Sequence, residues 1–272
     1  QYRPGARFGP RGIREASTLF SFGHGGAYDF EDDVTYMPAE RVSMVDIGDA
    51  DIVHTDMTKS HANTEYAVRK ILEAEALPVI LGGDHSIHAP AMNAYAGRGP
   101  VHIVQIDAHL DFVDERHGVR YGHGNPMRRS SEHDHVSGLT QLGIRNVSSS
   151  NREDYDDALD AGSTILSVRD VRRLGTDAVL DLIPQDVDHY VSIDIDGFDP
   201  SIAPGTGTPS HGGFLYYEVL ELMQGLAVRN RIVGVDMVEV SPPYDPSGIT
   251  SILAAQLLMN MLGFVFHARQ QT

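Results

Sequence analysis

The sequence predicts an α/β fold, a three-layer αβα sandwich with a central, mostly parallel sheet. Short apolar runs, of the kind that form strands buried on both faces, alternate along the chain with longer amphipathic stretches of helical period. The stretches between successive strands are also long enough for the crossover helix that parallel strands require. Because no linker, repeat or low-complexity segment interrupts this alternation, we predict one domain over residues 1–272.

The strands are predicted from apolar runs bounded by polar or turn residues. The run Pro78 to Leu81 is continuous and apolar, and it leads directly into Gly82-Gly83-Asp84-His85-Ser86. An apolar run without alternation is typical of a strand that is buried on both faces. The strands are expected at Val42 to Ile47, Pro78 to Leu81, Val101 to Ile106, Leu139 to Ile144, Thr164 to Ser167, His189 to Ile193 and Ile232 to Val238.

The helices are predicted where apolar residues recur every three or four positions among charged ones. In Thr58 to Ala76, for example, Val68, Ile71 and Leu72 share one face. The polar segment Phe20 to Arg41 shows little periodicity and is predicted to be irregular. The helices are expected at Gly12 to Leu19, Thr58 to Ala76, Ser86 to about Ala96, Glu153 to Ala161, Ala178 to Ile183, Tyr216 to Ala227 and Ile249 to Ala268.

Composition limits the classes of function. With 272 residues, 41% of them hydrophobic and 22% charged, the chain is large enough for a substantial core. No run is judged to reach the length of a membrane span and no signal peptide is recognised, so we expect a cytoplasmic protein without a membrane partner. The formal charge of -17 argues against nucleic acid as a partner. It is compatible with a cationic small substrate, although an acidic surface is the commoner explanation.

Cysteine content limits the kind of metal site. The chain has no cysteine and 14 histidines, which excludes disulfides and thiolate ligands. Any metal must therefore be held by histidine and carboxylate groups. Asp107-Ala108-His109-Leu110-Asp111 follows the predicted strand Val101 to Ile106, and its alternation lets two carboxylates and one imidazole converge while Ala108 and Leu110 turn away. Such ligands suit a divalent ion.

Candidate metal ligands follow three of the predicted strands, at the sheet edge where α/β proteins bind their ligands. Aspartates brought together there repel one another unless a cation lies between them. Four aspartates and two histidines exceed a single tetrahedral site and suit two ions that share carboxylates. Because oxygen ligands predominate, we favour Mn²⁺ over Zn²⁺. The candidate ligands are His85, Asp107, His109, Asp111, Asp194 and Asp196.

The chain resembles the ureohydrolases, a family that includes arginase, agmatinase, guanidinobutyrase and proclavaminate amidinohydrolase. The resemblance covers almost the whole chain in the family's order, and the family usually has one more segment before the first motif, so we expect a segment to be missing before Gln1. The motifs are Arg3-Pro4-Gly5-Ala6-Arg7-Phe8-Gly9-Pro10, Gly82-Gly83-Asp84-His85-Ser86, Asp107-Ala108-His109-Leu110-Asp111, Ser192 to Pro200, Ala203 to Pro209 and Glu239-Val240-Ser241-Pro242.

The resemblance implies a dinuclear manganese hydrolase that converts a guanidino group to urea and an amine. It implies that the six candidate ligands hold two Mn²⁺ ions per chain and that the protein is a trimer or hexamer. The guanidinium carbon is a poor electrophile, so water must be activated, and two divalent ions provide that activation at neutral pH. Asp111 would orient the activated water. By the same resemblance, His123 in Tyr121-Gly122-His123-Gly124 delivers a proton to the departing amine, and Glu239 pairs with the substrate guanidinium.

The substrate is predicted from the loop between Asp111 and His123. Phe112 and Val113 stand where arginases have polar contacts, which argues against arginine. Asp114 and Glu115 would attract the distal ammonium of agmatine, whereas Arg116 or Arg120 would bind the carboxylate of 4-guanidinobutyrate or a related acid. The segment Arg120 to Gly124 also looks more like the guanidino-acid and proclavaminate branches. We rank hydrolysis of agmatine to putrescine and urea first, and of a guanidino acid second.

Three hypotheses from other classes are open. A binuclear metallophosphoesterase would begin with its Asp-x-His motif and carry Gly-Asn-His, which is absent here. A deacetylase-like enzyme with one zinc ion shares the wider fold, but Asp194-Ile195-Asp196 argues for two ions. A non-catalytic metal-binding subunit of the family would be expected to lose ligands, yet all six are present. Of the other polar residues, Asp84, Asp199, Asp236 and His88 could support the ligands, although packing is the commoner explanation for His88, and no role is assigned to His102, His117 or His211.

Overall fold

The computed structural model describes residues 2–20, 25–147 and 150–271. In this part of the chain the central sheet has six strands in the order β3-β8-β7-β4-β5-β6, and every neighbouring pair is parallel. The predicted parallel sheet is therefore confirmed. The strands are β3 (Val79–Leu81), β4 (Val101–Ile106), β5 (Val136–Leu142), β6 (Thr164–Leu166), β7 (Asp188–Asp194) and β8 (Ile232–Val238).

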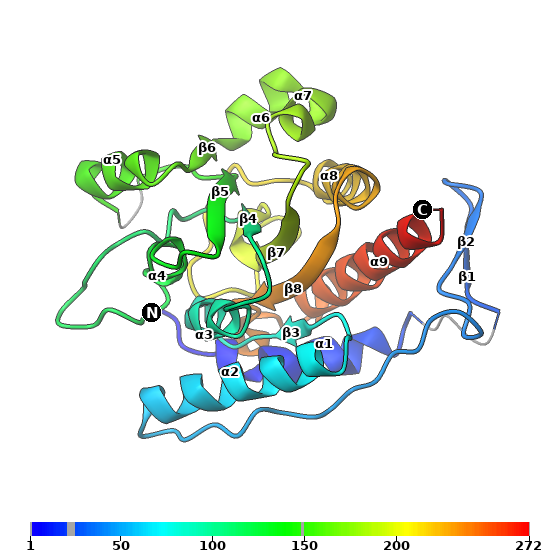
Figure 1. Ribbon diagram of the computed structural model, residues 1–272, viewed down its shortest axis with the longest axis horizontal. Coiled ribbons are helices and arrows are strands. Elements are labelled where there is room, and N and C mark those ends of the chain that lie inside the picture. The colour runs from blue at the N-terminus through cyan, green and yellow to red at the C-terminus, as the bar shows by residue number, and fades with distance from the viewer. Residues whose placement is uncertain (1, 21–24, 148–149, 272) are drawn as a thin grey trace.

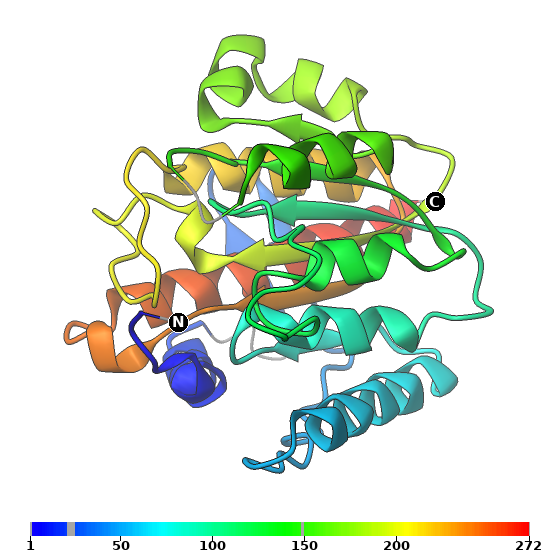
Figure 2. The ribbon, with the colours of Figure 1, turned by 90° about the vertical axis from the view of Figure 1, so that its left-hand side faces the viewer.

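Helices cover both faces of this sheet, as Figures 1 and 2 show, so the predicted three-layer sandwich is also confirmed. Each face has its own apolar core, to which the flanking helices contribute one side. One face is covered by α1 (Gly9–Ser17), α6 (Val168–Leu174), α7 (Thr176–Asp181), α8 (Tyr216–Arg229) and α9 (Ile249–Gln271). The other is covered by α2 (Met57–Glu73), α3 (His88–Asn93), α4 (Pro126–Ser131) and α5 (Arg152–Asp160).

The strand order reverses between β4 and β7. The chain proceeds outward from β4 to β5 and β6, and then returns to the other side of β4 with β7 and β8. In open α/β sheets, ligands bind at the carboxyl ends of the strands where the order reverses in this way. Ile106 of β4 lies level with Ile193 of β7. Because of this register, Asp107, which follows β4, and Asp194, the last residue of β7, lie at the same height.

The C-terminal helix α9 is the most apolar helix of the fold. By length and composition, residues Ile249–Gln270 could span a membrane, with a mean hydropathy of 1.8. The expectation that no segment reaches this length was therefore wrong. The helix is 72% buried inside the protein over this window, and it packs against α1 and α8 in the core beneath the sheet. Its apolar composition is thus explained by burial on most of its circumference.

The predicted strand Val42 to Ile47 is wrong. This segment has no regular secondary structure, and the side chains of Met44, Val45 and Ile47 are exposed to 60%, 74% and 62%. A run of β-forming residues becomes a strand only when a neighbour offers pairing and a surface to pack on, and no described strand lies beside this one. The irregular segment Phe20 to Arg41, of which residues 21–24 lie outside the described part, contains a short antiparallel hairpin of β1 (Ala27–Asp29) and β2 (Val34–Tyr36).

Candidate metal centre

The loops that carry the candidate ligands share one local device. Asp84, Asp107 and Asp194 each accept a hydrogen bond from the backbone N–H two residues further on, at 3.0, 2.6 and 2.9 Å. This contact closes a tight turn directly after a strand. It begins the short 3₁₀ helices His85–Ile87 and Ile195–Gly197. The sequence therefore turns the chain sharply near the ends of the strands, and His85, His109 and Asp196 lie within these turns.

The first ligand group gathers around His85. Its Nδ1 lies 2.9 Å from Asp111 Oδ2, 3.1 Å from Asp107 Oδ2 and 3.4 Å from Asp194 Oδ2. His85, Asp107 and Asp111 come from the loops after β3 and β4, and Asp194 is the last residue of β7. The sheet order brings these segments together. One imidazole nitrogen and three carboxylate oxygens at this spacing suit the coordination of one divalent ion.

The second ligand group lies beside the first and shares Asp107 with it. His109 Nδ1 is 3.1 Å from Asp196 Oδ2 and 3.5 Å from Asp107 Oδ1. Asp107, His109 and Asp196 thus form one group with metal-binding geometry, and His85, Asp107 and Asp111 form another. The two oxygens of Asp107 face different groups, as expected of a carboxylate that bridges two ions. All six predicted ligand residues lie in this one centre.

The electrostatics of the centre fit a pair of cations. Burial and the charge of Asp107 raise the pKa of Asp111 to about 6, and burial and Asp196 raise the pKa of Asp194 well above its usual value. His85 Nδ1 is buried and makes no hydrogen bond. Buried carboxylates that cannot all ionise together, beside an unpartnered imidazole nitrogen, are the condition that divalent ions relieve. The residues present therefore fit a binuclear metal site.

Two residues of the centre hold a backbone conformation that is uncommon for side chains larger than glycine. Asp111 has φ 52° and Glu239 has φ 64°. A residue in this left-handed region costs of order 1 kcal/mol or more, and such strain is found where function requires a particular side-chain direction. The backbone N–H of Glu239 donates to Gly83 O at 2.9 Å, which ties it to the loop that carries His85.

The two other predicted catalytic residues come from different loops, Glu239 from the loop after β8 and His123 from the loop before α4. The buried Glu239 carboxylate accepts a hydrogen bond from the backbone N–H of His85 at 3.0 Å, and burial together with Asp84 raises its pKa to about 8. His123 is partly buried in the loop before α4, and burial lowers its pKa. The charge of Asp84 raises the pKa of His123, and the charge of His85 lowers it.

The predicted substrate-binding charges lie in an exposed loop, and they are largely compensated. Asp114 Oδ1 lies 2.6 Å from Arg129 Nη2 and 2.9 Å from Arg120 Nη2. These contacts lower the pKa of Asp114, with the hydrogen bond from Arg129 as the main cause. Glu115 is exposed. The structure thus pairs Asp114 and Arg120 with each other, although the sequence assigned them to opposite substrates.

A cavity of about 380 Å³ opens beside His109, the more exposed of the two ligand histidines. Arg3 lines this cavity, donates to the carbonyls of Pro204 and Thr206, and stacks on Tyr244 at 4.2 Å. The N-terminal loop and the loop after β7 therefore form the wall around the second ligand group. The lining residues are Tyr2, Arg3, His109, Val147, Gly207, Thr208, Pro209 and Ser210.

The ligands are held by residues that the sequence did not single out. Gln105 Nε2 donates to Asp107 Oδ2 at 2.6 Å, and Thr208 Oγ1 donates to Asp196 Oδ2 at 2.8 Å. Arg145 donates to the carbonyls of Asp196 and Ser210, at 2.7 and 2.6 Å, and so joins the ligand loop to the cavity wall. Gln105 had a detectable signal, because it is a polar residue inside the apolar run Val101–Ile106.

The predicted supporting aspartates have separate tasks. Asp84 closes the turn before His85, and Asp236 accepts a hydrogen bond from Ser192. Asp199 accepts from the backbone N–H groups of Ser201, Gly212 and Gly213. A hydrogen bond from the Ser201 side chain, together with these backbone contacts, lowers the pKa of Asp199 to about 2. The backbone contacts also fix the loop after β7.

Comparison with known proteins agrees with this geometry. A model of the Arginase family matches residues 1–263. The mitochondrial guanidino acid hydrolase of Homo sapiens is 36% identical over 266 residues, which cover 96% of this chain and 73% of that protein. The mitochondrial agmatinase of Gallus gallus is 36% identical over 269 residues, which cover 96% of this chain and 76% of that protein.

A solved structure is similar over the same extent. The proclavaminate amidinohydrolase from Streptomyces clavuligerus superposes with a TM-score of 0.88 at 35% identity, covering 98% of this chain and 88% of that one. Family, fold and ligand groups agree along the chain. The chain therefore belongs to the arginase family and is a ureohydrolase of the branch that contains agmatinases and guanidino-acid hydrolases.

Proposed function

We propose that this chain hydrolyses the guanidino group of a small linear compound to urea and an amine, with two Mn²⁺ ions as cofactors. The observation that carries the proposal is the gathering of carboxylates around two histidines, with Asp107 shared between them. Asp107, Asp111 and Asp194 lie around His85 Nδ1, and Asp107 and Asp196 lie around His109 Nδ1. Four aspartates and two histidines make the site rich in oxygen ligands, which favours Mn²⁺ over Zn²⁺. The bound ions supply Lewis acidity and an activated water at neutral pH.

Three residues of the chain have further roles in this reaction. Glu239 pairs with the substrate guanidinium, since a buried carboxylate so close to the centre is stabilised by a cation. Asp111 accepts a hydrogen bond from the attacking water and orients it toward the guanidinium carbon. His123 delivers a proton to the nitrogen that leaves as the amine. Burial lowers the pKa of His123, and an imidazolium with a lowered pKa releases its proton more readily.

For the substrate, we now rank a guanidino acid ahead of agmatine. The preference for agmatine assumed that Asp114 and Glu115 attract an ammonium group, but Asp114 is paired with Arg120 and Arg129. Arg3, by contrast, lines the cavity and presents a permanent positive charge there. The net charge of -17 favours cations in general, but salt screens exposed charges beyond about 8 Å. The nearer charge of Arg3 therefore decides the preference.

The experiment is urea release by Mn²⁺-loaded protein from four substrates tested in parallel. They are 4-guanidinobutyrate, 3-guanidinopropionate, agmatine and arginine, with the double variant His85→Ala and Asp107→Ala as the blank. We expect the highest kcat/KM with one of the two guanidino acids. Urea released from agmatine alone would support the proposed reaction but would overturn the proposed preference for a guanidino acid over agmatine. No urea from any of the four would contradict the proposed function.

A further inference from the structure

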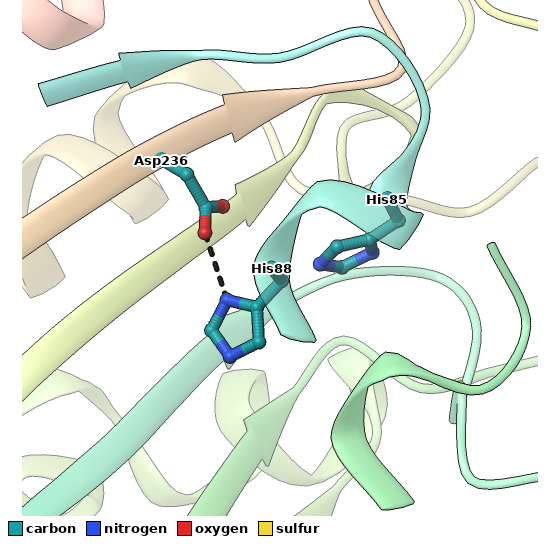
Figure 3. A group of neighbouring side chains, drawn as sticks. All are labelled: His85, His88 and Asp236. Atoms are coloured by element: carbon teal, nitrogen blue, oxygen red, sulfur yellow. Dashed lines mark hydrogen bonds and ion pairs between the residues drawn. The ribbon is translucent and has the colours of Figure 1, made fainter. Parts of the chain in front are cut away.

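A chain of hydrogen bonds extends from the metal centre into the core beneath His85. His85 Nε2 lies 2.8 Å from Ser192 Oγ, and Ser192 Oγ donates to Asp236 Oδ1 at 2.7 Å. The other oxygen of Asp236 lies 2.8 Å from His88 Nδ1, as Figure 3 shows. All four residues are buried, and the side chains of His85, His88 and Asp236 are almost completely inaccessible. Nothing in the proposed reaction uses Ser192, Asp236 or His88.

The sheet fixes the middle of this chain. Ser192 of β7 and Asp236 of β8 are direct partners in the parallel register. Their side chains therefore extend from the same face of two hydrogen-bonded strands. His85 and His88 approach that face from the turn after β3 and from the start of α3. Strand register, rather than a flexible loop, thus sets the position of the two central groups.

The directions of the hydrogen bonds follow from the carboxylate. An ionised Asp236 has only acceptor oxygens, so Ser192 must use its single proton toward Asp236. The lone pairs of Ser192 Oγ then remain for His85, and His85 Nε2 must carry the proton that is shared with them. A neutral imidazole has one protonated nitrogen, so His85 Nδ1 presents its lone pair to Asp107, Asp111 and Asp194.

The same atoms do not make a separate metal site. His85, His88 and Asp236 are close enough together to be considered as a ligand group. However, His85 Nε2, His88 Nδ1 and both oxygens of Asp236 already have hydrogen-bond partners at 2.7–2.8 Å. A cation there would break three buried hydrogen bonds, and each buried polar group left unpaired costs about 1–3 kcal/mol. A chain of hydrogen bonds therefore explains the positions of His85, His88 and Asp236 better than a separate metal site does.

We propose that Ser192 and Asp236 are positioning residues that hold His85 in the tautomer and orientation needed to bind a metal ion through Nδ1. This inference rests on the proposed function, because it concerns the metal site that the reaction uses. His88 holds the second oxygen of Asp236 and thereby fixes the plane of the carboxylate. Residues behind a metal-binding histidine typically change metal affinity or activity by about 10- to 100-fold when removed.

The test compares Ser192→Ala with a matched variant at the other side of the sheet. Thr140 of β5 is also a buried strand hydroxyl at hydrogen-bond distance from a histidine ring, His102 Nε2 at 2.9 Å, but that histidine is no metal ligand. Titration with Mn²⁺, followed by the signal of the free ion in electron paramagnetic resonance, measures the affinity of each site. We expect Ser192→Ala to weaken one of two Mn²⁺ sites by about 10- to 100-fold and Thr140→Val to change neither.

A second variant separates positioning from a loss of packing. In Asp236→Asn the side chain keeps its size, but an amide nitrogen that cannot accept a hydrogen bond replaces one of the two oxygens. Because Ser192 and His88 face different oxygens, one of them loses its acceptor. We expect a weaker Mn²⁺ site here too, of about tenfold, with the same circular dichroism spectrum as the wild type. In ¹⁵N-histidine-labelled protein loaded with diamagnetic Zn²⁺, the His85 Nε2 proton should be protected from exchange in the wild type and exchange faster in both variants.

The outcomes distinguish this inference from the proposed function. Two tight Mn²⁺ sites in the wild type with an unchanged pair in Ser192→Ala would overturn the positioning role and leave the proposed function intact. Two sites in the wild type, one of them weakened in Ser192→Ala, but no urea from any substrate would overturn the proposed function and support the positioning role. A wild-type protein that binds no Mn²⁺ would overturn both.

Discussion

The sheet has buried or largely buried histidines near both the amino and the carboxyl ends of its strands, and the two ends differ in chemistry. Strand β4 begins near His102 and runs to Asp107, and β7 begins near His189 and ends at Asp194. At the amino ends, His102 and His189 are register partners whose rings lie 5.4 Å apart. At the carboxyl ends, His85 and His109 lie among aspartates. All four side chains are buried or largely so.

The difference lies in the neighbours rather than in burial. Asp196 raises the pKa of His109, and the surrounding aspartates raise the pKa of His85 against the effect of burial. At the other end, burial and His189 lower the pKa of His102 to about 4, and burial lowers the pKa of His189. A buried histidine beside carboxylates exchanges protons for metal ions, whereas a buried histidine without them is neutral packing. This explains why counting histidines does not locate a metal site.

The largest effect is expected from removing the shared ligand at the carboxyl end. Each oxygen of Asp107 faces one ligand group. Asp107→Asn replaces one of these oxygens with an amide nitrogen and removes the negative charge of the other, so both ions should bind weakly and kcat/KM for urea release should fall by about 10⁴-fold, a loss of several kcal/mol. Chelation of the metal in the wild type should give a similar loss. The control is Asp188→Asn at the amino end of β7, which should keep full activity. A variant at Asp107 that retained two tight ions and normal activity would refute the bridging role.

A smaller loss is expected when the metal centre is kept and only the proton donor is removed. His123→Ala should lower kcat by about 10³-fold, within the range of general acid catalysis, with Mn²⁺ content unchanged. His117→Ala is the matched control, because this histidine lies in the same loop and is exposed. Steady-state kinetics with metal analysis on each variant would check this. Equal losses in both variants would point to a disturbed loop rather than to proton transfer.

At the amino end of the sheet, His102 should affect the free energy of unfolding at low pH rather than the enzymatic activity. His102 has a pKa of about 4 when folded and about 6.5 when unfolded. Below pH 6.5 the unfolded chain binds a proton that the native chain does not, so the free energy of unfolding should fall between pH 6.5 and 4 by roughly 3 kcal/mol and no further below pH 4. In His102→Gln this part of the decline should be absent. Chemical denaturation of the wild type and of His102→Gln, in chelator at several pH values, would measure the free energy of unfolding. An equal decline of this free energy with pH in both proteins would contradict the lowered pKa of His102.

Much of the fold and the grouping of the candidate ligands could be predicted because their signals are local. Each ligand motif directly follows an apolar strand, and the carboxyl ends of parallel strands meet at one edge of the sheet. The residues that support the ligands are different. Arg145 is recognisable only once the carbonyls of Asp196 and Ser210 have been brought to it by the fold. Thr208 likewise acquires its role from a contact with Asp196.

The errors have the same origin. Val42 to Ile47 has the composition of a strand, but pairing depends on a neighbour that the local pattern cannot reveal. Asp114 has the look of a free anion in its loop, yet it is paired with Arg129 of α4, a six-residue helix that periodicity did not predict. Charges in a loop therefore predict substrate contacts poorly until their partners within the protein are known.

The smallest loss of activity is expected from Arg3→Met, which compares the buried aspartates at the carboxyl end of the sheet with the positive charge of Arg3 in the cavity beside them. If Arg3 meets the carboxylate of a guanidino acid, Arg3→Met should lower kcat/KM for 4-guanidinobutyrate by roughly 10- to 100-fold, since a hydrogen bond to a charged group contributes about 1.5–3 kcal/mol. The same change should leave agmatine unaffected or improve it, because a positive charge no longer faces its ammonium group. Arg7→Met is the control, as Arg7 stacks on Phe8 and does not line the cavity. Equal losses with both substrates would show that Arg3 acts only through the carbonyls of Pro204 and Thr206, and the substrate preference would then have to come from elsewhere in the cavity wall.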